Sequence, residues 1–116
     1  MAEQNIADVT TIYGRTTTVV NLSTTNSTVF TTAANQIVKV NTVMASNKTS
    51  STVTVDLLYN NSAYIAYEIS IPPGSSIALV GKDTPIYVEE SETLDASAGT
   101  ASAVDLVISY EVIETS

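Results

Sequence analysis

The sequence predicts an all-β protein, an antiparallel β-sandwich of about eight short strands of the immunoglobulin-like or jelly-roll type. Three observations support this fold class. Apolar and polar residues alternate with a period of two over most of the chain. Strand-length runs follow one another at intervals of roughly ten residues and are separated by polar turns. No long segment has the apolar period of a helix, so the core must be built between sheets.

The first half of the chain supplies three of the expected strands. Residues 16–22 and 28–32 lie on either side of a polar turn at 23–26. Residues 36–46 form the next strand, which has one largely apolar face. The residues on that face are Val38, Val40, Thr42 and Met44.

The second half begins with an expected hairpin. Residues 52–59 and 63–71 alternate in the manner of strands, and residues 60–62 join them through two asparagines that tolerate a left-handed backbone. Pro72, Pro73 and Gly74 must end the hairpin, because proline cannot donate to a ladder. The remaining expected strands are 76–80, 85–89, a short one around Leu94, and 103–113.

The alternation also predicts which side chains are buried between the sheets. A strand must turn one of its two sets inward, and a slip of one residue would expose that set. The expected core residues are Val53, Val55, Leu57, Ile65, Tyr67, Ile69, Leu106 and Ile108.

The first 13 residues differ from the rest, so we expect two regions: an extended N-terminal arm at 1–13 and a single sandwich domain at 14–116. Apolar residues are sparse in the arm, and Thr10 and Thr11 disfavour a helix. Such a segment buries too little apolar surface to offset its ordering entropy, and we therefore expect it to contact another chain. The predicted partner-binding residues are Ile6, Val9, Ile12 and Tyr13.

Composition argues against catalysis and against several classes of ligand. The chain has no His, Cys or Trp, and its only cations are Arg15 and three lysines. Most neutral-pH catalysis needs an imidazole, a thiolate or a metal held by them, so we expect no enzyme, no metal and no cofactor. A net charge of −8 argues against nucleic acid and against anionic membrane surfaces. We find neither a signal peptide nor a membrane span, and we expect synthesis in the cytoplasm.

Three groups of residues are candidates for sites. The acidic run Glu89, Glu90, Glu92 and Asp95 lacks the spacing of a calcium loop and is interpreted as a solvated loop. Glu68 and Asp56 lie on adjacent expected strands and can approach each other, as the carboxylates of glycosidases do, but the chain is short for a cleft. Exposed tyrosines would suit a sugar-binding surface, and buried ones would be ordinary strand residues. The tyrosines are Tyr13, Tyr59, Tyr64, Tyr67, Tyr87 and Tyr110.

Residues 37–113 resemble a small virion structural protein of tailed bacteriophages, particularly those of marine cyanobacteria. The resemblance is carried by KVNTVMASN, by STVTVDLLYNNSAYIAYEISIPPGSSIALVGKDTPIYVEE and by SAVDLVISYEVIE near the end. It implies a sandwich that assembles on a phage particle, and it brings no catalytic motif. The N-terminal arm lies outside the matching part.

These observations together predict a noncatalytic virion structural protein, a capsid decoration or cement protein that binds the outer surface of the head shell. The expected partners are the major capsid protein and sister subunits in a homo-oligomer, with neither nucleic acid nor membrane involved. One alternative is a tail, collar or baseplate component, and another is a module that binds host glycans.

Overall fold

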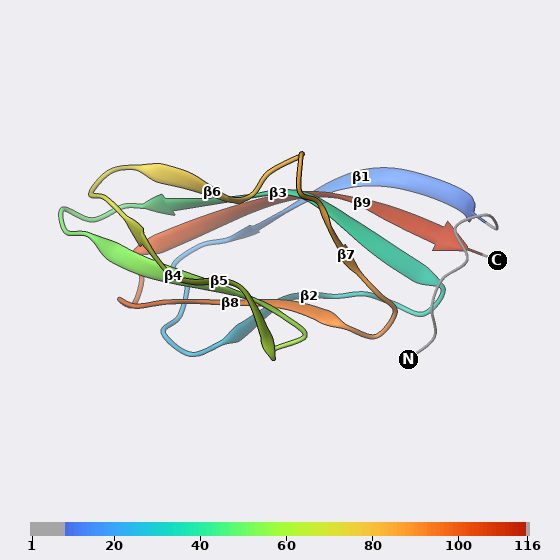
Figure 1. The fold of residues 1–116 in the computed structure, drawn as a ribbon, viewed down its shortest axis with the longest axis horizontal. Helices are drawn as coiled ribbons and strands as arrows, with labels where there is room; N and C mark the ends of the chain where they lie inside the picture. Colours follow the sequence, from blue (N-terminus) through green and yellow to red (C-terminus); the bar gives the residue numbers. More distant parts are fainter. Residues whose placement is uncertain (1–8, 116) are drawn as a thin grey trace.

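The computed structural model describes residues 9–115, which form two antiparallel sheets packed face to face (Figure 1). The sandwich is elongated, with principal extents of 48 × 22 × 20 Å. Within residues 9–115 there are nine strands and no helix. The strands are β1 (Val9–Val19), β2 (Ser27–Thr31), β3 (Gln36–Asn47), β4 (Val53–Tyr59), β5 (Ala63–Ile71), β6 (Ser76–Val80), β7 (Ile86–Val88), β8 (Thr93–Ala98) and β9 (Val104–Thr115).

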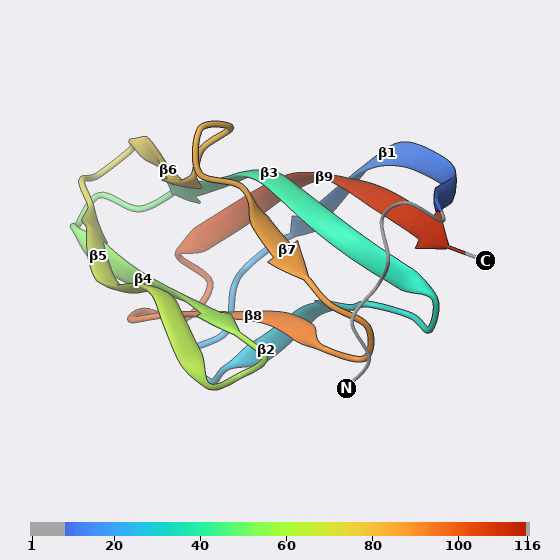
Figure 2. The same cartoon turned by 45° about the vertical axis from the view of Figure 1, so that its right-hand side comes forward.

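The strand order identifies the sandwich as a jelly roll, one of the two predicted types. One sheet has the order β1-β9-β3-β6, and β7 pairs with β3 beside β6; the other sheet has the order β2-β8-β4-β5. Most connections therefore cross from one sheet to the other, and β4 and β5 are joined as a hairpin within a sheet. Two interleaved Greek keys of this kind define the jelly roll. Figure 2 shows the two layers and the β7 segment that runs beside β3.

The core fills the space between the sheets and comes from the inward-facing residues of both. Five of the eight predicted core residues are buried, namely Val53, Val55, Leu57, Leu106 and Ile108. Phe30 of β2 stacks on Tyr110 of β9 with ring centroids 5.0 Å apart, which joins the two sheets. The prediction of a sandwich core is confirmed for β4 and β9.

The expected apolar face of residues 36–46 is wrong beyond its midpoint. Pairing of β3 with β9 shifts register between Val40 and Thr42, so a β-bulge at Asn41 reverses the alternation. Val40 faces the core before the bulge, and Val43 faces it afterwards, both with 0% exposure. Met44 is therefore turned to the outer face, where it is 38% exposed.

The predicted burial of Tyr67 and Ile69 on β5 is also wrong. Pairing of β5 with β4 shifts register twice, between Val55 and Leu57 and again between Leu57 and Leu58. These two bulges break the period of two beyond Ile69 and leave Tyr67 57% exposed. Ile69 lies before the bulges, opposite the buried Val55, and is 37% exposed because β5 is an edge strand. The third expected residue of this strand, Ile65, is half-buried against the core.

The turns form as their residues predict. Asn60 and Asn61 both have a φ of 53°, the left-handed conformation that a tight hairpin turn requires. Gly74 has a φ of 66° and reverses the chain after β5.

Asn47 ties three chain segments together at one end of the sandwich. The residue is buried, and its amide nitrogen donates to the carbonyls of Ser51 and Ile71 at 2.7 and 3.0 Å. Its amide oxygen accepts from the backbone N–H of Thr49 at 2.8 Å. The buried Asn47 side chain therefore supplies hydrogen bonds to backbone groups beyond the end of β3, where the ladder no longer does so.

The C-terminal part of the expected arm is placed in the sandwich instead. Residues 9–13 form the start of β1 and pair with the end of β9, from Val9 opposite Thr115 to Tyr13 opposite Val112. This pairing satisfies the ladder groups of β9, and Tyr13 packs against the core. Ile6 and the rest of residues 1–8 lie outside the described part of the chain.

Candidate functional site

The acidic run after β7 is not a single solvated cluster. Glu90 accepts the backbone N–H of Asn35 at 2.6 Å, and Glu92 accepts the hydroxyl of Tyr59. Asp95 lies in the middle of the inner strand β8 and is only 1% exposed. Across residues 9–115 no three or more acidic side chains are arranged to hold a metal ion. The solvated-loop interpretation is therefore wrong for Asp95.

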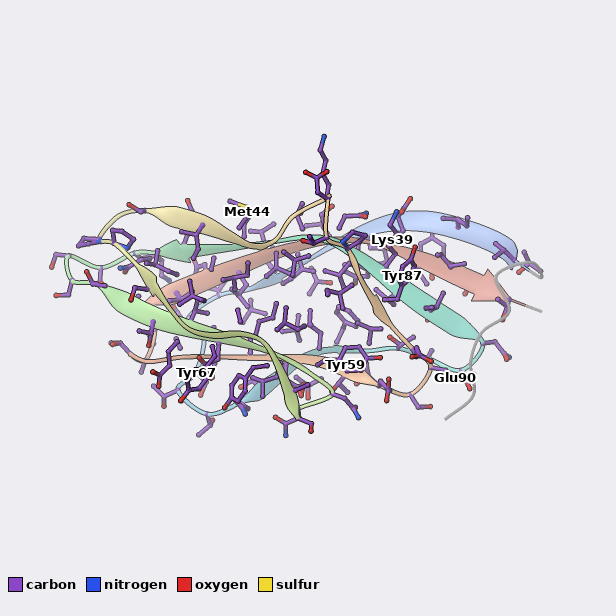
Figure 3. All side chains as sticks on the ribbon, in the orientation of Figure 1. Lys39, Met44, Tyr59, Tyr67, Tyr87 and Glu90 are labelled. Atoms are coloured by element: carbon purple, nitrogen blue, oxygen red, sulfur yellow. The ribbon has the colours of Figure 1, made fainter. Side chains whose placement is uncertain are left out.

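Tyr59 lies where β4, β7 and the loop after β7 meet (Figure 3). Its hydroxyl donates to Glu92 and accepts the backbone N–H of Glu89 at 3.2 Å. Burial and the hydrogen bond to the Glu92 carboxylate raise the pKa of Tyr59 to about 12. This arrangement is structural, since it fastens the loop to the sandwich.

A second polar cluster lies in the β1-β9-β3-β6 sheet where β1 and β3 end. Lys48 forms an ion pair with Asp105 at 2.9 Å, and Asp105 also accepts the backbone N–H of Asn21 at 2.9 Å. The N–H bond from Asn21 and the Lys48 ammonium lower the pKa of Asp105. The cluster joins the end of β1 to the loop that follows β3.

Asp56 and Glu68 are neighbours at the bulge in β5, but the contact between them joins the Asp56 carboxylate to the Glu68 backbone and is not the pairing of two carboxylates that a glycosidase uses. The carboxylate of Asp56 accepts the backbone N–H of Glu68 at 2.6 Å and the hydroxyl of Ser97 at 3.4 Å. Glu68 has a φ of 46°, which is costly for a residue with a side chain. Asp56 therefore compensates a strained backbone by accepting the N–H that the ladder leaves unpaired.

Two of the six tyrosines lie together and exposed beside this bulge. The rings of Tyr64 and Tyr67 are 4.7 Å apart at an interplanar angle of 71°, an edge-to-face contact. They are 52% and 57% exposed. We call Asp56, Tyr64, Tyr67 and Glu68 the tyrosine patch.

Figure 3 shows Tyr67 on the outer side of the β2-β8-β4-β5 sheet, whereas Tyr87 and Lys39 lie at the other sheet. The sequence contains no signal for the tyrosine patch, because residues 63–71 hold neither Gly nor Pro to mark a bulge.

The predicted partner-binding residues lie at different depths. Ile12 is 56% exposed on β1, whereas Val9 and Tyr13 are half-buried. Of the three predicted partner-binding residues that the structure describes, Ile12 therefore offers the most exposed apolar surface. Its role in partner binding remains a prediction.

Sheet edges are the other exposed feature. Within residues 9–115, strand β1 pairs only with β9 and so presents a row of backbone groups on its far side that no other strand of this part of the chain uses. It is 11 residues long and carries one charged residue, Arg15. Long edges with few charges readily accept another strand. No helix in the described part of the chain is long and apolar enough to cross a membrane.

Of the comparisons with known proteins, only the one with solved structures finds a similar chain. No protein-family model matches the sequence, and no curated protein matches it significantly. One solved structure with a similar fold comes from work on Bacillus endospore appendages, described as a novel family of disulfide-linked pili. The match has a TM-score of 0.51 and 18% sequence identity, and it covers 90% of this chain and 88% of that one. This likeness shows the shared fold alone, and it does not extend to a phage origin.

Proposed function

We propose that the chain is a noncatalytic structural subunit that assembles with other protein chains, and specifically a decoration protein on the outer surface of a bacteriophage head. The observation that carries the proposal is the open, weakly charged edge of β1, which is suited to pairing with a strand of a neighbouring chain. The resemblance of residues 37–113 to phage structural proteins supports the specific form.

The acidic composition agrees with such a role. A net charge of −8 keeps separate subunits soluble at high concentration before they assemble. Docking then depends on a few sites where backbone groups or apolar side chains are available, such as the β1 edge and Ile12.

The fold likeness to a pilus subunit favours a second candidate, a self-assembling filament. The Bacillus appendages are disulfide-linked pili, and a subunit with the same architecture is thus compatible with polymers. This chain has no cysteine, so any polymer it forms is held without disulfides.

Lysines placed on β1 test the docking edge. Thr16 and Thr18 are exposed on β1, and replacing both by Lys adds two charges next to the free edge. The matched control replaces Thr28 and Thr31 by Lys. Both threonines are exposed on the edge strand β2, so the control adds the same charge to the other sheet.

Co-sedimentation with phage heads that lack the protein measures attachment, and electron microscopy of the protein alone detects filaments. We expect weaker attachment for the β1 variant than for the control, without filaments. Equal attachment of both variants would reject the β1 edge. Filaments of the protein alone would favour the pilus-like candidate.

A further inference from the structure

The tyrosine patch has the properties of a binding site for a positively charged side chain. We propose that it binds an arginine or lysine presented by a partner protein. The inference rests on the proposed function only in taking that partner to be another structural protein.

The first argument is geometric. In a regular strand Tyr64 and Tyr67 point to opposite faces, because their spacing of three is odd. The extra residue opposite Leu57 and Leu58 places both rings on the outer face of the sheet, in contact with each other. The bulge thus exposes two aromatic rings at one place that regular pairing would have separated.

The second argument is electrostatic. The four strands of this sheet, β2, β4, β5 and β8, contain three acidic residues and no Lys or Arg. Among the described residues, Lys39 and Lys48 are paired with Glu111 and Asp105 on the opposite sheet. The negative charge beside the tyrosines is therefore left without a cation of its own sheet.

Asp95 adds an independent observation on the same face. It is opposite Leu58, which is in turn opposite Tyr64, so the three residues form one row across the sheet. Asp95 is 1% exposed, and its Oδ1 atom has no hydrogen-bond partner in the described chain. Its Oδ2 atom accepts the hydroxyl of Thr93 at 3.1 Å, so Asp95 adds one acidic side chain with a free acceptor atom to the row that ends at Tyr64.

The carboxylates of the patch also act on Tyr67. The nearby Glu68 carboxylate and its hydrogen bond to the phenol raise the pKa of Tyr67, and Asp56 contributes in the same direction. Tyr67 therefore stays neutral, with its ring face available to a cation.

A cationic side chain fits these features better than a sugar does. An arginine guanidinium can stack on a tyrosine ring while donating to the Glu68 carboxylate, and it gains from charge as well as from contact. A neutral sugar gains contact and hydrogen bonds but nothing from the uncompensated charge. A glycan is therefore the competing outcome of the test.

The test uses two peptides with the full-length protein, followed by amide NMR. The probe is acetyl-Gly-Arg-Gly-Arg-Gly-amide, and its control replaces each arginine by citrulline, which keeps the shape and removes the charge. We expect the arginine peptide to shift the amides of Tyr64, Tyr67 and Glu68 and to bind about three- to tenfold more tightly than the citrulline peptide.

Variants locate the binding. Replacing both Tyr64 and Tyr67 by Ala should abolish the difference between the peptides, and Glu68→Gln should reduce it. The matched control is Tyr87→Ala, which removes a tyrosine that is 44% exposed on the other sheet and should change nothing. Unchanged thermal unfolding would show that each variant is folded.

Several results would overturn the inference. These are equal binding of the two peptides, no binding of either, or shifts that persist in the double variant. Methyl β-galactoside or methyl α-mannoside shifting the same amides, without a response to arginine, would assign the patch to glycans. Because the peptide measurement needs no phage particle, it can refute the tyrosine patch without refuting the docking role of the β1 edge, and the attachment assay can do the reverse.

Discussion

Removing the hydroxyl of Tyr59 should destabilise the protein in a pH-dependent way. In Tyr59→Phe, the bonds to Glu92 and to the N–H of Glu89 are lost while the ring remains. A hydrogen bond to a charged group contributes roughly 1.5 to 3 kcal/mol, and the partial solvation of this site reduces the expected cost to about 1 to 2 kcal/mol at pH 7.

The pKa of Tyr59 sets the pH window. The value of about 12 in the folded protein is above the ordinary value of 10.0, so the folded state favours the neutral phenol. The stabilisation that the neutral phenol of Tyr59 contributes is complete below pH 10 and is lost as the pH rises through the pKa of the folded protein. The full shift corresponds to about 2.7 kcal/mol, and solvent screening reduces the usable part to roughly half.

Urea unfolding at pH 8 and at pH 11 measures this effect. We expect the difference in unfolding free energy between the natural protein and Tyr59→Phe to shrink by about 1 kcal/mol between these pH values. Other ionisable groups titrate in both proteins and cancel in the difference. Tyr87→Phe, which removes an exposed hydroxyl, serves as the control. A difference that stays constant with pH would refute the account of Tyr59.

Four further changes test the packing and the polar clusters. Leu106→Ala should cost about 2 to 5 kcal/mol in urea unfolding, because the residue is 0% exposed between the sheets, and a cost under 1 kcal/mol would contradict its core position. Asn47→Ala should cost about 2 to 4 kcal/mol, since it leaves buried carbonyls without donors; a neutral effect in the same assay would show that water replaces the amide. Gly99→Ala should cost about 1 to 3 kcal/mol, because its new methyl would overlap the hydroxyl of Thr54, and adding Thr54→Ala should restore most of the melting temperature. Asp105→Asn should lower the melting temperature at neutral pH, and this loss should fade as the pH falls through the lowered pKa of Asp105; a loss that persists in acid would contradict the role given to the Asp105 charge.

Local pattern predicted the parts of the fold that depend on local chemistry. The turn at Asn60 and Asn61 and the stop at Gly74 follow from backbone preferences, and alternation along β4 and β9 identified their core residues. The bulges in β3 and β5 could not be predicted, because they arise from fitting one strand to its neighbours in register. They account for the misplaced Met44 and Tyr67.

The candidate site was predictable only in its components. The tyrosines and the proximity of Asp56 and Glu68 were apparent in the sequence, but their common face depends on the β5 bulges. The extension of β1 back to Val9 was missed because the apolar residues Val9 and Ile12 lie three apart and do not show the period of two that marks a strand. Pairing with β9 decides its conformation, and a partner so distant in sequence leaves no local trace.

The central position of β9 has a consequence for how the chain acquires its structure. Among the nine strands of residues 9–115, β1 and β3 are joined in the ladder only through β9, which is the last of the nine to leave the ribosome. Until residues 104–115 emerge, both strands expose unpaired edges, and the closing contacts join residues as far apart as Val9 and Thr115. Folding dominated by such distant contacts is slow and exposes the chain to aggregation. The β1 side of this sheet must therefore wait for β9, and a chain that stops short of β9 can pair β3 only with β6 and β7.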